Sequence, residues 1–143
     1  MYYVNREQIT KRLDVISGLA DSMEILTAKW NGELLQGLAQ ERALHLAVET
    51  VTDIGSFLID GFIMRDASSY EDIVDIIHGE GVFPSVLYEP LQSLVKLRKP
   101  LVQEYYEWPR QELHPLTSIL PNVLLQFRQA VEDYLVRELG TRT

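Results

Sequence analysis

Apolar residues recur at steps of three and four along almost the whole chain of 143 residues, while strict alternation over five or more residues is rare. This period is typical of helices that bury one face, and half-buried strands need a period of two. The clearest stripe lies between residues 34 and 63 and consists of Leu44, Ala47, Val51, Ile54 and Leu58. At about 1.5 Å per residue, this segment should form the longest helix of the molecule. The sequence therefore predicts an all-α protein.

Turn signals divide the chain into four long helices and one short helix. The first helix ends before Asn31-Gly32, a turn dipeptide, and Ser68 with Glu71 indicates a capping box at the start of the short helix. Since no repeat, low-complexity tract or linker interrupts the pattern, residues 1–143 should form one domain. The expected fold is an antiparallel up-and-down four-helix bundle with one additional short helix. The five segments are 9–23, 34–63, 70–78, 87–105 and 120–134.

Composition excludes several classes of protein. Thirteen Lys and Arg against 21 Asp and Glu give a net charge of −8, which excludes a general nucleic-acid coat protein. No cysteine is present, so disulfides, thiolate metal sites and Cys nucleophiles are excluded, and the three histidines are too scattered for a zinc spacing. The longest stretch without Asp, Glu, Lys or Arg, residues 113–127, contains two prolines. We therefore expect no membrane span, no metal, no cofactor and a cytoplasmic protein.

Arg98 breaks the apolar pattern. It lies four residues after Leu94 and three before Leu101, where the stripe of the fourth helix in chain order, residues 87–105, calls for an aliphatic side chain. An uncompensated buried charge costs several kcal/mol, so its guanidinium needs an acceptor. One interpretation is structural: Arg98 extends to the rim, or it forms an ion pair with Glu49 or Asp53 of the second helix.

A functional interpretation of Arg98 rests on its neighbours. Pro100 removes one hydrogen bond from the helix and should kink it, and irregular helix geometry often accompanies a site. Lys96, Arg98 and Lys99 also form the densest basic cluster in this acidic chain. Such a cluster is either a solvated face or a binding site for a phosphate.

The segment Arg98-Lys99-Pro100-Leu101-Val102-Gln103-Glu104-Tyr105 resembles the signature of HepT-like proteins of the HEPN superfamily. In that signature an Arg is followed, after four intervening residues, by a His and, two positions further on, by a Tyr. The long second helix and the approach Gly81-Val82-Phe83-Pro84 are similar to the family as well. The resemblance implies a dimeric four-helix bundle and a metal-independent ribonuclease that acts on RNA as a toxin. It also implies a minimal nucleotidyltransferase as antitoxin, which can modify the motif tyrosine.

Gln103 departs from this signature at the position of the His, and Lys99 stands where a small polar residue is common. An amide cannot exchange a proton near neutral pH, and a positioned acid or base contributes roughly 10²–10⁴ in rate. Arg98 could still bind a phosphate, and Tyr105 could donate a hydrogen bond or accept a nucleotidyl group. Glu104 is a conceivable substitute base, although residues one apart on a helix point in different directions.

These residues support two main hypotheses of function. The first is a HepT-like ribonuclease whose activity on single-stranded RNA is weakened or lost, with Arg98, Gln103 and Tyr105 in the site. The second is a non-catalytic homodimer that binds a minimal nucleotidyltransferase or an RNA-handling protein. A purely structural homodimer is a third possibility. The wide apolar stripes of the second and fourth helices predict that both contribute to the dimer interface.

Overall fold

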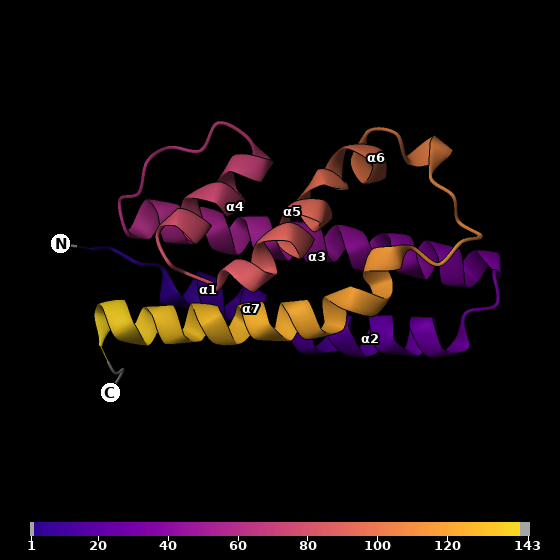
Figure 1. Cartoon of the computed structure of the whole chain (residues 1–143), viewed down its shortest axis with the longest axis horizontal. Helices are drawn as coiled ribbons and strands as arrows, with labels where there is room; N and C mark the ends of the chain where they lie inside the picture. The colour runs from indigo at the N-terminus through magenta and orange to yellow at the C-terminus, as the bar shows by residue number, and fades with distance from the viewer. Residues whose placement is uncertain (1, 141–143) are drawn as a thin grey trace.

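A computed structural model describes residues 2–140, and its regular structure there is entirely helical (Figure 1). The all-α prediction is therefore confirmed, and the elements follow the predicted order. Their bounds are α1 Arg6–Leu13, α2 Ile16–Lys29, α3 Leu34–Gly61, α4 Tyr70–Gly79, η1 Ser85–Leu87, α5 Tyr88–Lys96, α6 Arg98–Val102, η2 Tyr105–Glu107 and α7 Pro115–Leu139. None of the helices in this part of the chain is both long and apolar enough to cross a membrane.

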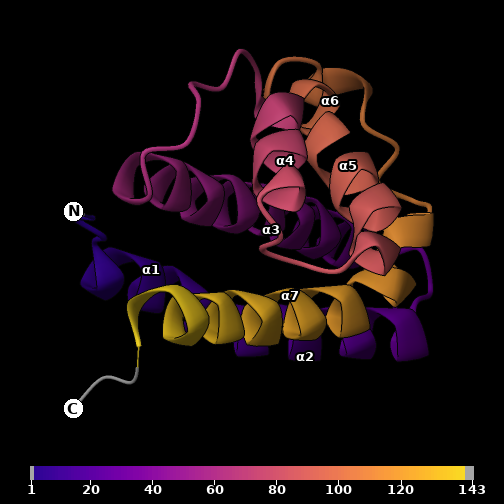
Figure 2. The same ribbon diagram turned by 60° about the vertical axis from the view of Figure 1, so that its left-hand side comes forward.

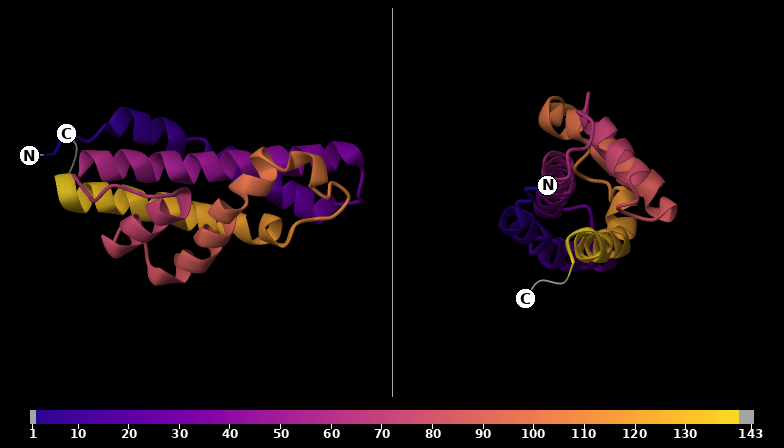
Figure 3. Two further views of the ribbon diagram at one scale, coloured as in Figure 1. Left: turned by 90° about the horizontal axis from the view of Figure 1, so that it is seen from above. Right: turned by 90° about the vertical axis from the view of Figure 1, so that its left-hand side faces the viewer.

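Three long rods form the body of the molecule. The α2 helix runs antiparallel to α3 and α7, and the α7 helix packs along α2 (Figure 1). The α4 and α5 helices cross over α3 on the side away from α2, and α5 also contacts α7 (Figure 2). Seen along the long axis, the helices surround one common interior (Figure 3). The up-and-down order of the predicted bundle is thus present, with α4 as the additional short helix.

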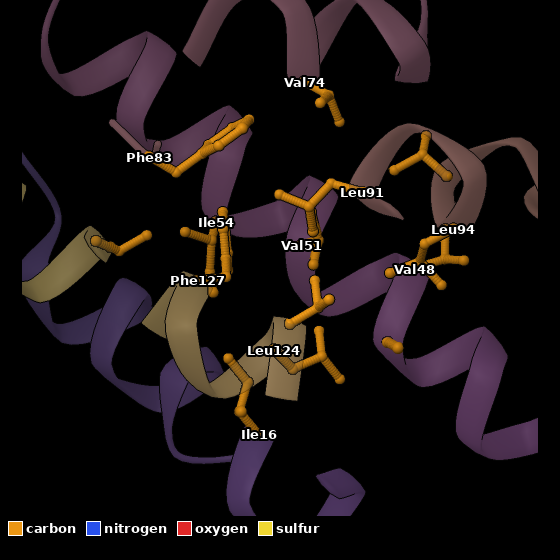
Figure 4. Packing of buried hydrophobic residues seen from close by; sticks show 14 of the residues in the cluster. Ile16, Val48, Val51, Ile54, Val74, Phe83, Leu91, Leu94, Leu124 and Phe127 are labelled. Carbon is orange, nitrogen blue, oxygen red and sulfur yellow. The ribbon is translucent and has the colours of Figure 1, made fainter. Parts of the chain in front are cut away.

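The interior is built from apolar residues that all of these layers contribute. Side chains from α2, α3, α4, α5 and α7 meet there, together with Phe83 from the loop before η1 (Figure 4). Complete burial of a Leu, Ile or Phe side chain stabilises the fold by about 1.5–3 kcal/mol, so this cluster is the main stabilising element. The labelled members are Ile16, Val48, Val51, Ile54, Val74, Phe83, Leu91, Leu94, Leu124 and Phe127.

The predicted first helix is in fact two helices. The amide of Val15 donates to the carbonyl of Arg12 at 3.1 Å, a bond to the third preceding residue that tightens the chain between α1 and α2. Neither proline nor glycine lies at this break, so no residue type marks it in the sequence. Because Leu13 and Ile16 are buried on both sides of the break, the core stripe continues across it.

The predicted fourth helix is also interrupted, and Pro100 explains where. Its nitrogen carries no hydrogen for the carbonyl of Lys96, and its ring crowds that carbonyl. The helix therefore stops at Lys96, Leu97 forms a tight turn with its amide on Leu94, and α6 begins at Arg98. The α6 helix ends at Val102, so Gln103 lies just beyond α6 and Tyr105 lies in η2 rather than on one continuous helix.

The cap of α4 is shifted by one residue from the prediction. The hydroxyl of Ser69, not Ser68, accepts the amide of Asp72 at 3.0 Å. The Asp72 carboxylate, rather than Glu71, reaches back to Ser68 and also pairs with Arg65 at 2.7 Å. The Arg65 guanidinium holds the pKa of Asp72 well below its usual range.

Glycine substitutions test the packing of α3. A Cβ on Gly37 would lie 2.0 Å from the carbonyl oxygen of Arg110, whereas a Cβ on Gly18 in α2 would meet no atom within 4 Å. Alanine normally stabilises a helix by about 0.5–1 kcal/mol relative to glycine. We expect Gly18→Ala to raise the free energy of unfolding by about that amount, and Gly37→Ala to lower it by about 1–3 kcal/mol because backbone must move. Urea denaturation of both variants checks this, and a stabilised Gly37→Ala variant would contradict the close approach.

Candidate functional site

Arg98 is the first residue of α6 and lies between α3 and α4. Its NH2 group lies 3.7 Å from Oε1 of Glu49, and the guanidinium stacks over the ring of Tyr70 at 4.2 Å from the centroid. Its side chain is only 26% exposed. The structure therefore pairs Arg98 with one of the two predicted acids, and it adds an aromatic partner that the sequence analysis did not consider.

Asp53, the other predicted acid, pairs elsewhere. Its Oδ2 accepts Nε of Arg12 at 3.2 Å, and the Arg12 guanidinium lies over the ring of Phe57. The α1 helix packs on α3 at this level, so it supplies a nearer cation than α6 does. Of the two acids that were predicted as partners of Arg98, Glu49 forms the ion pair and Asp53 pairs with Arg12 instead.

The N–H groups of the Arg98 guanidinium are not used in hydrogen bonds to the described residues. Within residues 2–140 it makes no hydrogen bond, and its Nε is buried without a partner. The distance of 3.7 Å to Glu49 is an ion pair and is too long for a hydrogen bond. A phosphate oxygen that replaced this contact would gain a charge-assisted bond, so the environment of Arg98 fits an anionic ligand.

The Glu49 carboxylate also contacts a histidine. Nε2 of His45 lies 3.2 Å from the same Oε1 of Glu49 that faces Arg98, and Nδ1 of His45 lies 3.1 Å from NH1 of Arg42. The sequence analysis considered the histidines only as metal ligands and gave His45 no role in the site. A signal was present in the spacing, since residues four apart on a helix are neighbours on its surface.

The predicted site residues that follow Arg98 lie in α6 or just beyond its end: Lys99 is in the helix, and Gln103 and Glu104 follow it. The amide of Gln103 donates to the carbonyl of Lys99 at 2.8 Å, while its side chain is exposed and makes no hydrogen bond to any described residue. Nζ of Lys99 lies 4.0 Å from Oε2 of Glu104, an exposed pair that contributes little stability. Glu104 therefore pairs with Lys99, and Arg98 forms its ion pair with Glu49 instead.

Tyr105 is 55% exposed, and its ring meets that of Tyr106 edge to face at 5.7 Å. The carbonyl of Tyr105 accepts NH2 of Arg110 at 2.9 Å. Arg110 in turn holds Glu41 of α3 through two hydrogen bonds of 2.6 and 3.0 Å. The backbone of Tyr105 is thus fixed to α3 while its ring remains accessible.

Gln40 completes this anchor. Its fully buried amide donates to the carbonyl of Glu112 at 3.0 Å and accepts the amide of His114 at 2.8 Å and the hydroxyl of Thr117 at 2.7 Å. The sequence analysis missed both Gln40 and Arg110. A polar residue within a helix gives no sign by itself that a distant loop will satisfy its hydrogen bonds.

Among the residues that the structure describes, no three His, Asp or Glu side chains lie close enough to hold a metal ion. The acidic residues of this region instead face cations of the protein: Glu49 faces Arg98, Asp53 faces Arg12, and Glu41 faces Arg110. The chemistry of the site therefore comes from guanidinium, imidazole, amide and phenol groups.

Residues 10–114 match the family described as ribonuclease HepT-like, and the chain belongs to this family. A relative in Bacillus subtilis (strain 168), named "Putative RNase YutE", is 38% identical over 98% of this chain and 96% of its own length.

The solved structure of YutE from Bacillus subtilis, described as a cytosolic protein of unknown function, superposes with a TM-score of 0.87. It is 34% identical and covers 100% of this chain and 99% of its own. The resemblance to the HepT-like family and the HEPN-like helical fold are thereby confirmed.

His114 caps α7 with a titratable side chain, so the stability of this part of the fold depends on pH. Its Nδ1 accepts the amide of Leu116 at 3.0 Å and so caps α7, and its ring stacks on Trp108. Burial lowers the pKa of His114 below its ordinary value. The neutral ring that accepts this bond is therefore favoured in the folded protein.

We expect the contribution of His114 to stability to be complete above about pH 6.5 and to decrease as the pH falls below it, because the unfolded chain takes up the proton first. Urea denaturation between pH 7.5 and 5.5 measures this loss. A His114→Asn variant keeps a capping side chain without the titration and should lose less stability over the same range. Equal losses in the two proteins would refute this role of His114.

Proposed function

We propose that this chain is a HepT-like protein that binds single-stranded RNA through Arg98 and has weak or no ribonuclease activity. The observation that carries the proposal is the contrast between two positions of the motif. Arg98 is positioned by Glu49 and Tyr70 with its hydrogen bonds unused, while the position of the motif His holds the exposed amide of Gln103.

RNA cleavage without a metal needs charge stabilisation at the phosphate and a group that moves a proton. Arg98 supplies the first, since a guanidinium can bind two phosphate oxygens at once. Gln103 cannot supply the second, because an amide has no accessible pKa near neutrality. Without a positioned acid or base, about 10²–10⁴ of the rate is lost. Tyr105 assists by donating a hydrogen bond from its exposed hydroxyl.

The partner that we propose is a minimal nucleotidyltransferase antitoxin, as the toxin–antitoxin context of the family implies. Tyr105 supports this proposal, because its accessible hydroxyl can accept a nucleotidyl group while Arg110 holds its backbone. The same features support the alternative function, a non-catalytic binding partner of that enzyme or of an RNA-handling protein. We place the chain in the cytoplasm because YutE is described as cytosolic.

We also propose a homodimer. The apolar stripe of the predicted fourth helix was expected to contribute to the interface, but its members Leu91 and Leu94 are buried inside the monomer. Exposed apolar side chains lie instead at the start of α3, where Leu35 is 77% exposed and Leu38 is nearly half exposed, and on η2. We therefore propose that the first turns of α3 form the dimer interface.

The test of the motif is the variant Gln103→His. In buffer with EDTA and a labelled single-stranded RNA oligonucleotide, the parent should cut slowly or not at all. Gln103→His should raise the cleavage rate by up to roughly 10²–10⁴. Adding Arg98→Ala to Gln103→His should remove the gain, because the phosphate then loses its cation.

A parent protein that cuts RNA rapidly, with Gln103→Ala leaving the rate unchanged, would show that the motif does not limit this protein. If neither the parent nor Gln103→His binds the RNA, an RNA site at Arg98 is wrong. The nucleotidyltransferase-binding alternative would then remain and can be tested with a purified minimal nucleotidyltransferase.

Light scattering tests the dimer. The parent should have twice the mass of the chain at micromolar concentration, and Leu35→Glu with Leu38→Glu should produce a monomer because two charges enter an apolar contact. Ile25→Glu on α2 is the matched control, since Ile25 is 58% exposed and lies outside the proposed interface. A monomeric parent would refute the proposal.

A further inference from the structure

We propose that His45 on α3 accepts the proton during RNA cleavage at Arg98, in place of the imidazole that the motif has lost at Gln103. This inference rests on the proposed function. Its basis is one carboxylate oxygen, Oε1 of Glu49, which lies 3.2 Å from Nε2 of His45 and 3.7 Å from NH2 of Arg98. The imidazole and the phosphate-binding cation thus share one partner, although they come from different helices.

The hydrogen bonds of His45 define which nitrogen is basic. Arg42 can only donate, so Nδ1 of His45 must accept from it at 3.1 Å. The Glu49 carboxylate can only accept, so the ring proton lies on Nε2 and points to Glu49. This network assigns a neutral imidazole with its lone pair on Nδ1. A carboxylate behind one ring nitrogen orients the ring and stabilises the imidazolium that forms when the other nitrogen takes up a proton.

The exposure of His45 and the two arginines around it favour binding of a polyanion over a purely structural role. Its side chain is 28% exposed, so the ring is reachable from solvent. Arg42 and Arg98 contact its two sides, directly and through Glu49 respectively. A phosphate that binds Arg98 can also draw the exposed Arg42 away from Nδ1, which frees the lone pair only when substrate is present.

Each of the other candidate bases already interacts with another group of the protein. Glu104 faces Lys99. His78 lies against Phe83 and Tyr88, with Nε2 on the hydroxyl of Ser85. His114 uses Nδ1 to cap α7. His45 is therefore the histidine of this chain that shares a partner with Arg98.

The proposed step is an internal transesterification of RNA. Nδ1 of His45 takes the proton of the 2′-hydroxyl, the 2′ oxygen forms a bond to phosphorus, and the bond between phosphorus and the 5′ oxygen breaks. Water gives a proton to the departing 5′ oxygen, and the imidazolium returns its proton to the solvent. Arg98 holds the phosphate oxygens as their charge increases.

The test compares His45→Ala with the parent and with His78→Gln, the control at a histidine outside the cluster. With the labelled RNA in EDTA at saturating protein, His45→Ala should lower the residual cleavage rate about 10²-fold or more, and added imidazole should restore part of it. RNA affinity, measured by fluorescence anisotropy, should change less than about twofold. His78→Gln should cleave like the parent. A thermal melt of each variant verifies its fold.

A second readout is the effect of His45→Ala on the cleavage rate when it is introduced into the Gln103→His variant. There the motif imidazole can move the proton, so His45→Ala should cost far less than it does in the parent. An equal loss in both backgrounds would indicate a structural role and overturn the inference. An unchanged rate in His45→Ala, a loss of RNA binding with no rescue by imidazole, or a parent without any cleavage would overturn it as well.

These failures are distinct from a failure of the proposed function. A parent without cleavage that binds RNA and gains activity through Gln103→His would leave the proposed function intact and remove only the role of His45. The RNA-binding part of the proposed function fails if neither the parent nor Gln103→His binds RNA, and its catalytic part fails if the parent cuts RNA rapidly.

Discussion

The missing hydrogen bond between Pro100 and the carbonyl of Lys96 determines the geometry of the whole site. Because the helix cannot continue through that bond, it turns at Leu97 and starts again at Arg98. Arg98 then meets α3 and α4 instead of the centre of the bundle, where its charge would have needed full compensation. The second segment is too short to carry the rest of the motif, so Tyr105 falls in a separate 3₁₀ turn. One proline thus places Arg98 and Tyr105 on separate helical segments.

The α3 helix contacts both of the segments that Pro100 separates: the one with Arg98 and the one with Tyr105 and the loop after it. Its first turns hold the returning chain: a buried amide at Gln40 satisfies three loop groups, Glu41 binds Arg110, and the lack of a side chain at Gly37 lets the backbone of Arg110 approach closely. Two turns further along, the same helix presents His45 and Glu49 to the motif. Anchoring and chemistry therefore lie on one rigid rod, and a site on a rod is held more firmly than a site on loops.

The sequence predicted those parts of the molecule that depend on local periodicity. The spans of α3 and α4 follow from their apolar stripes and turn residues, whereas α7, Pro115–Leu139, extends beyond the predicted 120–134 at both ends. Arg98 was recognised because it interrupts a stripe. The break before Val15 was not predictable, because it depends on a single backbone bond and on no residue type. The partners of Asp53 and Gln40 were not predictable either, because they come from segments about 40 and 70 residues away in the sequence. Periodicity shows which face is buried, and it does not show which distant group satisfies a polar atom on that face.

Membership of a ribonuclease family and ribonuclease chemistry are separable in this chain. The family relation rests on the whole helical fold, whereas cleavage rests on one proton-transfer group, which a single change from imidazole to amide removes from the motif. The phosphate binding that we propose for Arg98 does not depend on that group, and neither does the exposure of Tyr105, whose backbone is fixed through Arg110 and Glu41 rather than through α6. Binding can therefore outlast catalysis in this fold. For any cleavage that remains, we propose a proton acceptor outside the motif, on α3, because this helix contacts Arg98 with an acid already paired to an imidazole.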